Sequence, residues 1–299
     1  ALLLGLTLTA TWHGAYYLAL SPQAQPVAFA FGGEAKPKDY ARTMADGAVL
    51  ALIACLGLAL LSHEASPILV QLALVSLSFY GVAALSYHPR YSAIALVTGL
   101  IGLSLSGAPS FAVLMSIGSG LLLLADKNTE RTKTRIQQAL FLMLLGGIVA
   151  ALAHDLALWH WRLAPLESSL SAWRSHLRLL AWFTWPAWPL VIWTLWRWRR
   201  QWAYLNWSRH LLVPLWFSSL TVGTAVMSQS SQQTLLLSLP SMATLAAFAL
   251  PTMRRSVTAL IDWFALLFFS FCAMLIWVVW LAMQTGWPRA PAHNVMRLA

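Results

Sequence analysis

Long apolar stretches with few charged side chains fill most of this 299-residue sequence. Only 9% of the residues are charged, against roughly 25% in soluble domains. A water-soluble fold cannot cover its surface with so few charges, so the sequence predicts an integral membrane protein. Because a transmembrane helix needs about 20 residues, the chain has room for about ten spans and no large soluble domain. We therefore predict an all-α, polytopic protein with a single membrane domain over residues 1–299.

Hydropathy and helix-breaking residues place the predicted spans. They run over residues 2–20, 44–62, 67–85, 91–106, 109–125, 136–158, 176–196, 210–227, 234–250 and 257–284. The fourth and fifth are short, and they are either two thin spans or one hairpin that does not fully cross the bilayer. Pro186 and Pro189 inside the seventh span predict a kink or a division into two half-helices.

Basic residues gather on one predicted side of the membrane. If the loop 126–135 is cytoplasmic and the spans alternate, 14 Lys and Arg residues lie inside and 5 lie outside. This asymmetry follows the positive-inside rule, so the net charge of +10 indicates topology and not nucleic-acid binding. Ala1 then lies outside with no signal peptide before it, which predicts that an upstream segment is missing from this sequence.

Two carboxylates in the predicted outer region have a histidine beside them, in His63-Glu64 and His154-Asp155. Histidine and carboxylate are the usual proton-transfer pair, and ionisable groups at the membrane rim are functional candidates. The simpler interpretation of each pair is a wet helix end that faces lipid headgroups. Asp46 is instead predicted in the first turn of a span, where a carboxylate complements the helix dipole.

Tryptophan-rich segments suggest contacts with lipid. The outer segment at about 159–177 predicts an amphipathic stretch that lies along the membrane, with Arg162 and Arg174 among its tryptophans. Arginine with aromatic neighbours suits a lipid phosphate, and a simple anchor explains the segment equally well. Trp185 and Trp188 either line a groove for a long apolar chain or pack in the core.

Sequence motifs for several common chemistries are absent. The chain has no CxxC, HExxH, Walker or GxSxG motif, and Cys55 and Cys272 lie inside apolar runs, so we predict no metal site built from these motifs. Six glycines within the spans fit close helix packing: Gly57, Gly81, Gly102, Gly118, Gly146 and Gly147.

Three runs together resemble one enzyme family. ADGAVLALIACLGLALLSHEASPILVQLALVSLSFYG (45–81), AWFTWPAWPLVIWTLWRWRR (181–200) and LPSMATLAAFALPTMRRSVTALIDWFALLFF (239–269) stand in the order found in bacterial GT-C glycosyltransferases, as does TGWP (285–288). These membrane enzymes are related to protein O-mannosyltransferases and aminoarabinose transferases. The resemblance implies a multi-pass protein of the bacterial inner membrane that uses a polyprenyl-phosphate-linked sugar at the periplasmic face.

The resemblance also defines what this chain lacks. Family members carry an Asp-Glu and Arg-Tyr motif in a large periplasmic loop after their first span, and its Asp is the presumed general base. No such motif occurs here, and Ser106-Gly107 stands where relatives often have Ser-Lys-Gly. Either an N-terminal part is missing or the protein is a degenerate relative.

Three hypotheses follow. In the first, an enzyme uses Glu64 and His63 near the reaction, while Arg162 and Arg174 hold the donor phosphate, with or without a divalent metal ion. In the second, a non-catalytic GT-C-derived subunit packs against a protein partner in a larger membrane complex. A transporter is the third and is disfavoured, because no inverted repeat is detectable. Membrane lipids are expected partners in each case, and nucleic acid in none.

Overall fold

The computed structural model describes residues 1–25, 35–61, 66–125, 132–159, 170–199, 208–227, 231–253, 255–287, 289 and 293. All regular structure in these residues is helical, which confirms the predicted all-α class. The chain divides into two compact units, Ala1–Pro251 and Thr252–Ala299. The prediction of a single membrane domain over 1–299 stays a prediction.

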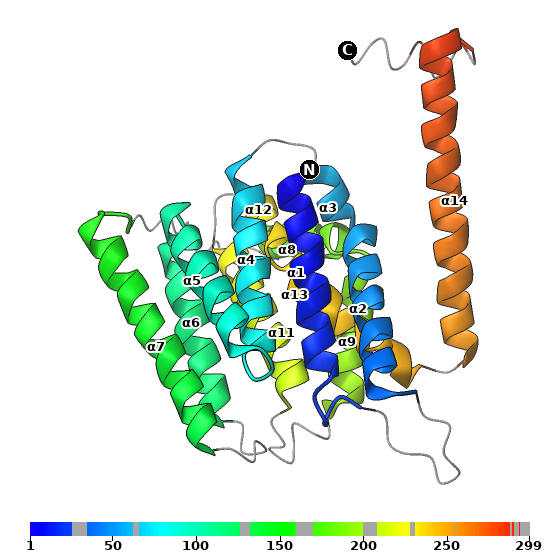
Figure 1. The fold of residues 1–299 in the computed structure, drawn as a ribbon. Helices are drawn as coiled ribbons and strands as arrows, with labels where there is room; N and C mark the ends of the chain where they lie inside the picture. Colours follow the sequence, from blue (N-terminus) through cyan, green and yellow to red (C-terminus); the bar gives the residue numbers. More distant parts are fainter. Residues whose placement is uncertain are drawn as a thin grey trace. The chain divides into compact units, whose positions relative to one another are not determined.

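Unit 1 contains α1 to α13 (Figure 1). Its helices are α1 (Leu2–Ala19), α2 (Pro37–Ala54), α3 (Leu56–Leu61), α4 (Pro67–Ala84), α5 (Pro89–Leu105), α6 (Pro109–Ala125), α7 (Thr132–Asp155), α8 (Leu170–Phe183), α9 (Ala187–Arg197), α11 (Arg209–Val226), α12 (Ser231–Leu236) and α13 (Leu239–Ala247). A short 3-10 turn, η1 (Leu250–Thr252), follows. Many of these helices have proline in their first turn, where its missing N–H is not needed.

Four stretches are long and apolar enough to cross a membrane: Pro67–Ala84, Thr132–Asp155, Gln232–Thr252 and Asp262–Thr285. The last belongs to unit 2, whose helix α14 (Arg255–Thr285) carries apolar side chains that are largely exposed. The apolar helices α5 and α6 are shorter. Several helices of the chain are therefore suited to a bilayer.

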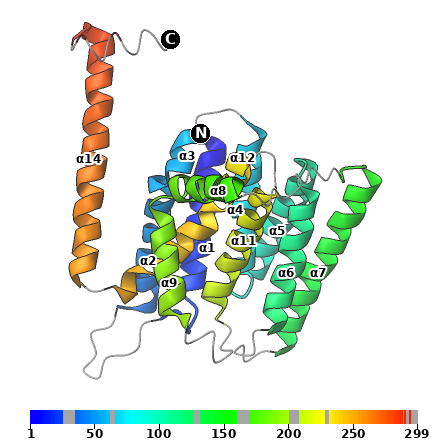
Figure 2. The ribbon, with the colours of Figure 1, turned by 180° about the vertical axis from the view of Figure 1, so that it is seen from behind.

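The long helices α1, α2, α4, α5, α6 and α7 of unit 1 alternate in direction, whereas α3 continues the direction of α2 and α8 lies across the bundle (Figures 1 and 2). We call the end where α2, α5, α7 and α11 begin the basic end, and the opposite end, where α8 lies, the α8 end. Among the described residues of unit 1, nine Lys and Arg residues lie at or near helix termini of the basic end, and two lie on α8. The nine are Lys36, Lys38, Arg42, Arg90, Lys133, Arg135, Arg197, Arg199 and Arg209, and the two are Arg174 and Arg178.

Three predicted spans are divided in the structure. Residues 176–196 do not form one span, because α8 ends at Phe183 and lies across the bundle, and α9 starts at Ala187 (Figure 2). The division falls at Pro186, as the prolines predicted. Residues 44–61 belong to α2 and α3, separated at Cys55, and residues 234–250 contain parts of α12, α13 and η1.

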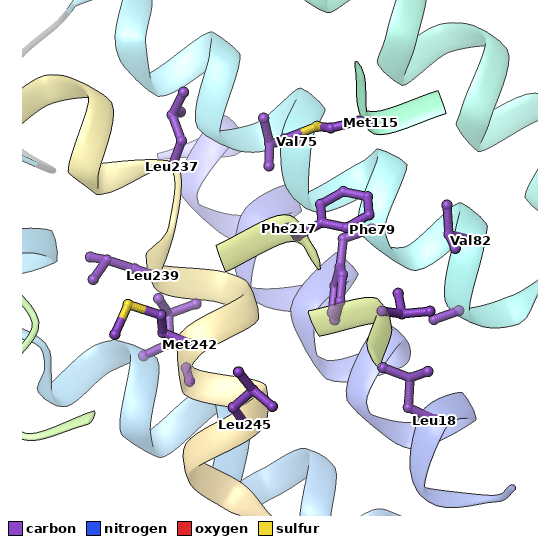
Figure 3. Packing of buried hydrophobic residues seen from close by; sticks show 14 of the residues in the cluster. Leu18, Val75, Phe79, Val82, Met115, Phe217, Leu237, Leu239, Met242 and Leu245 are labelled. Carbon is purple, nitrogen blue, oxygen red and sulfur yellow. The ribbon is translucent and has the colours of Figure 1, made fainter. Parts of the chain in front are cut away.

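The core of unit 1 forms around α13, every residue of which is buried. This helix contacts α1, α2, α4, α9 and α11. A helix that is apolar all round belongs in a core, and small residues such as Ala243 and Ala246 let its neighbours approach closely. Beside α13, Phe79 of α4 and Phe217 of α11 meet edge to face with 5.4 Å between ring centroids (Figure 3).

Candidate functional site

The candidate site lies at the α8 end, where α3, α8 and α12 contact one another. The last residue of α3 is Leu61, directly before the segment 62–65 that contains His63 and Glu64. His63 and Glu64 themselves lie outside the described residues, as do Arg162 and most of the predicted outer segment at 159–177. The structure therefore locates the elements that flank these residues.

Close packing ties α3 to the junction between α8 and α9. Gly57 of α3 lies against the ring of Phe183, so closely that a Cβ there would be 2.3 Å from the Phe183 Cδ1 and Cε1 atoms. The Leu56 N–H donates to the Trp185 carbonyl at 3.1 Å, and Cys55 just before α3 is buried 3.9 Å from the Thr184 carbonyl, with its thiol donating to the Ala51 carbonyl at 3.1 Å. These contacts hold the start of α3 beside the end of α8.

Helix α8 is amphipathic and carries the cationic side chains of the site. Its inner side is formed by Leu179 and Leu180, which pack against the core, and by the buried Phe183. Arg174 and Arg178 are exposed and stand four residues apart, so they share one face of the helix. Within the described residues neither guanidinium is paired with a carboxylate. Arg178 was not among the predicted site residues, although its spacing of four residues from Arg174 indicates that the two side chains share a helix face.

The second predicted histidine–carboxylate pair does not join this site. His154 and Asp155 are exposed at the end of α7, which also reaches the α8 end. However, α7 packs on α5 and α6 at one edge of unit 1, whereas α2 and α3 lie toward the other edge (Figures 1 and 2). His154-Asp155 therefore lies at the α8 end but away from α3.

Asp46 differs from its predicted setting. Helix α2 begins at Pro37, so Asp46 lies more than two turns inside the helix and not in its first turn. Arg42 is 3.4 Å from Asp39, and Asp46 Oδ1 instead accepts a hydrogen bond of 2.7 Å from the Trp12 indole N–H. The predicted span starts at residue 44, seven residues after the start of the helix, because the first turns of α2 are polar and hydropathy does not detect a polar helix.

An aromatic cluster at the basic end was not predicted. Tyr17 of α1 lies 5.4 Å from Tyr87, 5.5 Å from His88 and 6.2 Å from Tyr80, measured between ring centroids. Tyr91 follows at 6.4 Å from His88. Burial raises the pKa of Tyr87 above its ordinary value, and the charge of Arg209 partly offsets this rise. Tyrosines of this kind are typical of a membrane–water interface.

The tryptophans at the α8–α9 junction are only partly in the core. Trp188 packs against the core, whereas Trp185 is 40% exposed, and their ring centroids are 6.5 Å apart. A groove for an apolar chain at this place stays a prediction.

Within the described residues, no three His, Cys, Asp or Glu side chains are grouped as a metal site needs. Comparisons with protein-family models, curated proteins and solved structures found no match to the chain.

Proposed function

We propose that the chain acts as a GT-C-type membrane glycosyltransferase, with a polyprenyl-phosphate-linked sugar as donor and its site at the α8 end. One observation carries the proposal: α3, which leads into His63-Glu64, packs against α8, which bears Arg174 and Arg178. The residues that follow α3 in the sequence include a carboxylate, and α8 carries a cationic pair. This is the combination that transfer from a phosphate leaving group requires.

In this proposal the residues have separate tasks. Glu64, with His63 beside it, takes the proton from the acceptor hydroxyl while the acceptor oxygen attacks the anomeric carbon of the donor sugar. The bond from that carbon to the phosphate oxygen breaks, and the polyprenyl phosphate leaves as an anion. Arg174, Arg178 and Arg162 stabilise the anion through charge-assisted hydrogen bonds.

The proposed topology places the α8 end on the periplasmic side of a bacterial inner membrane, with about ten spans. The distribution of basic residues in unit 1 supports this orientation. The aromatic cluster around Tyr17 supports a membrane boundary at the basic end.

Single cysteines report this orientation. In a variant without Cys55 and Cys272, Ser175→Cys on α8 is expected to react with a membrane-impermeant maleimide in intact cells that express the protein. Thr132→Cys at the start of α7 is expected to react only after the cells are permeabilised. Both side chains are exposed, so access to reagent decides the result. The reverse labelling pattern would place the basic end outside and remove the proposal.

The role of α8 is tested by binding of undecaprenyl phosphate, measured by native mass spectrometry on the purified protein. The double change Arg174→Ala and Arg178→Ala is expected to raise Kd at least about 100-fold, because each arginine lost removes a charged hydrogen bond of about 1.5–3 kcal/mol and about 1.4 kcal/mol is tenfold in Kd. Arg197→Ala with Arg199→Ala removes the same charge at the basic end and serves as the matched control. Equal Kd values for the two double variants would contradict the assignment.

The non-catalytic alternative predicts a different result in the same preparation. A GT-C-derived subunit would bind no undecaprenyl phosphate and would purify with one stable protein partner.

A further inference from the structure

The outward face of α1 and α2 carries an acid and an imidazole near the middle of the two helices. Asp46 of α2 is exposed, and the Trp12 N–H is the hydrogen-bond donor that the structure gives its carboxylate. His13 is also exposed, and its ring lies 4.9 Å from the ring of Trp12. One tryptophan therefore stands between the carboxylate and the imidazole, at one level of the bundle.

This level lies far from the ends of both helices. Trp12 is the eleventh of the 18 residues of α1, and Asp46 is the tenth of the 18 residues of α2. Ionisable side chains at such a depth in a membrane almost always face protein or a water-filled cavity and not lipid. If α1 and α2 cross a bilayer, as in the proposed function, another polypeptide surface must therefore cover Asp46.

The same face is shaped for close contact with a helix. Gly5 and Thr9 precede His13 at intervals of four residues, and both are exposed. A Cβ at Gly5 would meet no atom within 4 Å, and the Thr9 hydroxyl bonds back to the Gly5 carbonyl at 2.9 Å. Leu2 of α1 and Leu50 of α2 are exposed as well and add apolar surface to these helices. Small residues at four-residue spacing let membrane helices approach closely.

We propose that this face is covered by a second copy of the chain, related by a two-fold axis parallel to the helices and close to Trp12. Such an axis keeps each residue at its own depth. It places Asp46 of one protomer opposite His13 of the other, and the reverse pair forms at the same time. Each carboxylate then faces an imidazole of the other protomer, and because His13 Nδ1 lies 2.8 Å from the Thr9 carbonyl, Nε2 is the ring nitrogen left for the partner's Asp46. The inference rests on the membrane placement in the proposed function and is independent of glycosyl transfer.

Cross-linking in native membranes tests the dimer. In the full chain without Cys55 and Cys272, Thr9→Cys is expected to form a disulfide-linked homodimer under mild oxidation. Leu144→Cys, which is 67% exposed on α7, is the matched control and is expected to stay monomeric. Adding Asp46→Ala to Thr9→Cys is expected to lower the cross-linked fraction at least about tenfold. Exchanging the pair, with Asp46→His and His13→Asp together, is expected to restore it.

Other outcomes overturn the inference. If the protein resists carbonate extraction from membranes but the Thr9→Cys variant stays monomeric, the dimer is excluded. A cross-link to a polypeptide of different mass would show that another protein covers the face. If carbonate extracts the protein, the chain does not span the membrane, and both the proposed membrane placement and the proposed dimer are wrong. Cross-linking that persists in the Glu64→Gln protein separates the dimer from the catalytic proposal.

Discussion

Replacing Glu64 by glutamine is expected to lower glycosyl transfer about 100- to 10,000-fold, the usual contribution of a positioned general base. The amide keeps the size of the side chain but cannot accept the acceptor proton. The measurement is the release of polyprenyl phosphate from a mixture of polyprenyl-phosphate-linked sugars, with the purified protein in liposomes. Because the substitution conserves shape, the thermal unfolding midpoint should stay the same.

The matched control is Asp39→Asn, which removes a carboxylate at the basic end. Asp39 is exposed and lies 3.4 Å from the guanidinium of Arg42, far along α2 from the α8 end. We expect normal transfer from this variant. A wild-type rate from the Glu64→Gln protein would remove Glu64 from the reaction.

The second large effect concerns stability. Gly118→Ala is expected to lower the free energy of unfolding by about 2 kcal/mol, because overpacking a tight contact costs about 1–3 kcal/mol. A Cβ on Gly118 of α6 would be 2.1 Å from Cζ2 of Trp216 on α11, which is far inside van der Waals contact. In detergent, the unfolding midpoint should fall by about 4–8 °C.

Gly147→Ala on α7 is the matched control. A Cβ at Gly147 meets no atom within 4 Å, so the change removes a helix-weakening glycine at no steric cost. It should leave the midpoint unchanged or raise it, because alanine is favoured over glycine in helices by about 1 kcal/mol. Equal midpoints for the two variants would mean that Trp216 does not pack on Gly118.

This pair of glycines shows one limit of prediction from sequence. The spans contain six glycines that fit close helix packing, and sequence treats Gly118 and Gly147 alike. The structure places Phe183 against Gly57 and Trp216 against Gly118, whereas Gly147 faces open space. Which residue stands opposite a glycine depends on a helix that is distant in sequence.

The candidate site also contains features that the sequence predicted and features that it did not. Arg174 was predicted from its aromatic neighbours, and the structure places it on a helix that lies across the bundle. Hydropathy predicted that residues 176–196 form one span, which was wrong, because an interfacial helix and a short vertical helix can have the same mean apolarity. Asp46 was likewise predicted at a helix start, and only packing against α1 brings Trp12 to its carboxylate.

The sequence alone determined the helical class and the end of unit 1 at which the described Lys and Arg residues gather. Both follow from where charges are scarce and where the remaining Lys and Arg residues gather, and these are properties of single residues and their order. Only the tertiary structure decided that α13 fills the core, that α3 meets α8, and that the Trp12 indole N–H donates to Asp46. The physical reason is that lipid and protein interior are equally apolar, so hydropathy cannot distinguish a helix face that meets one from a face that meets the other.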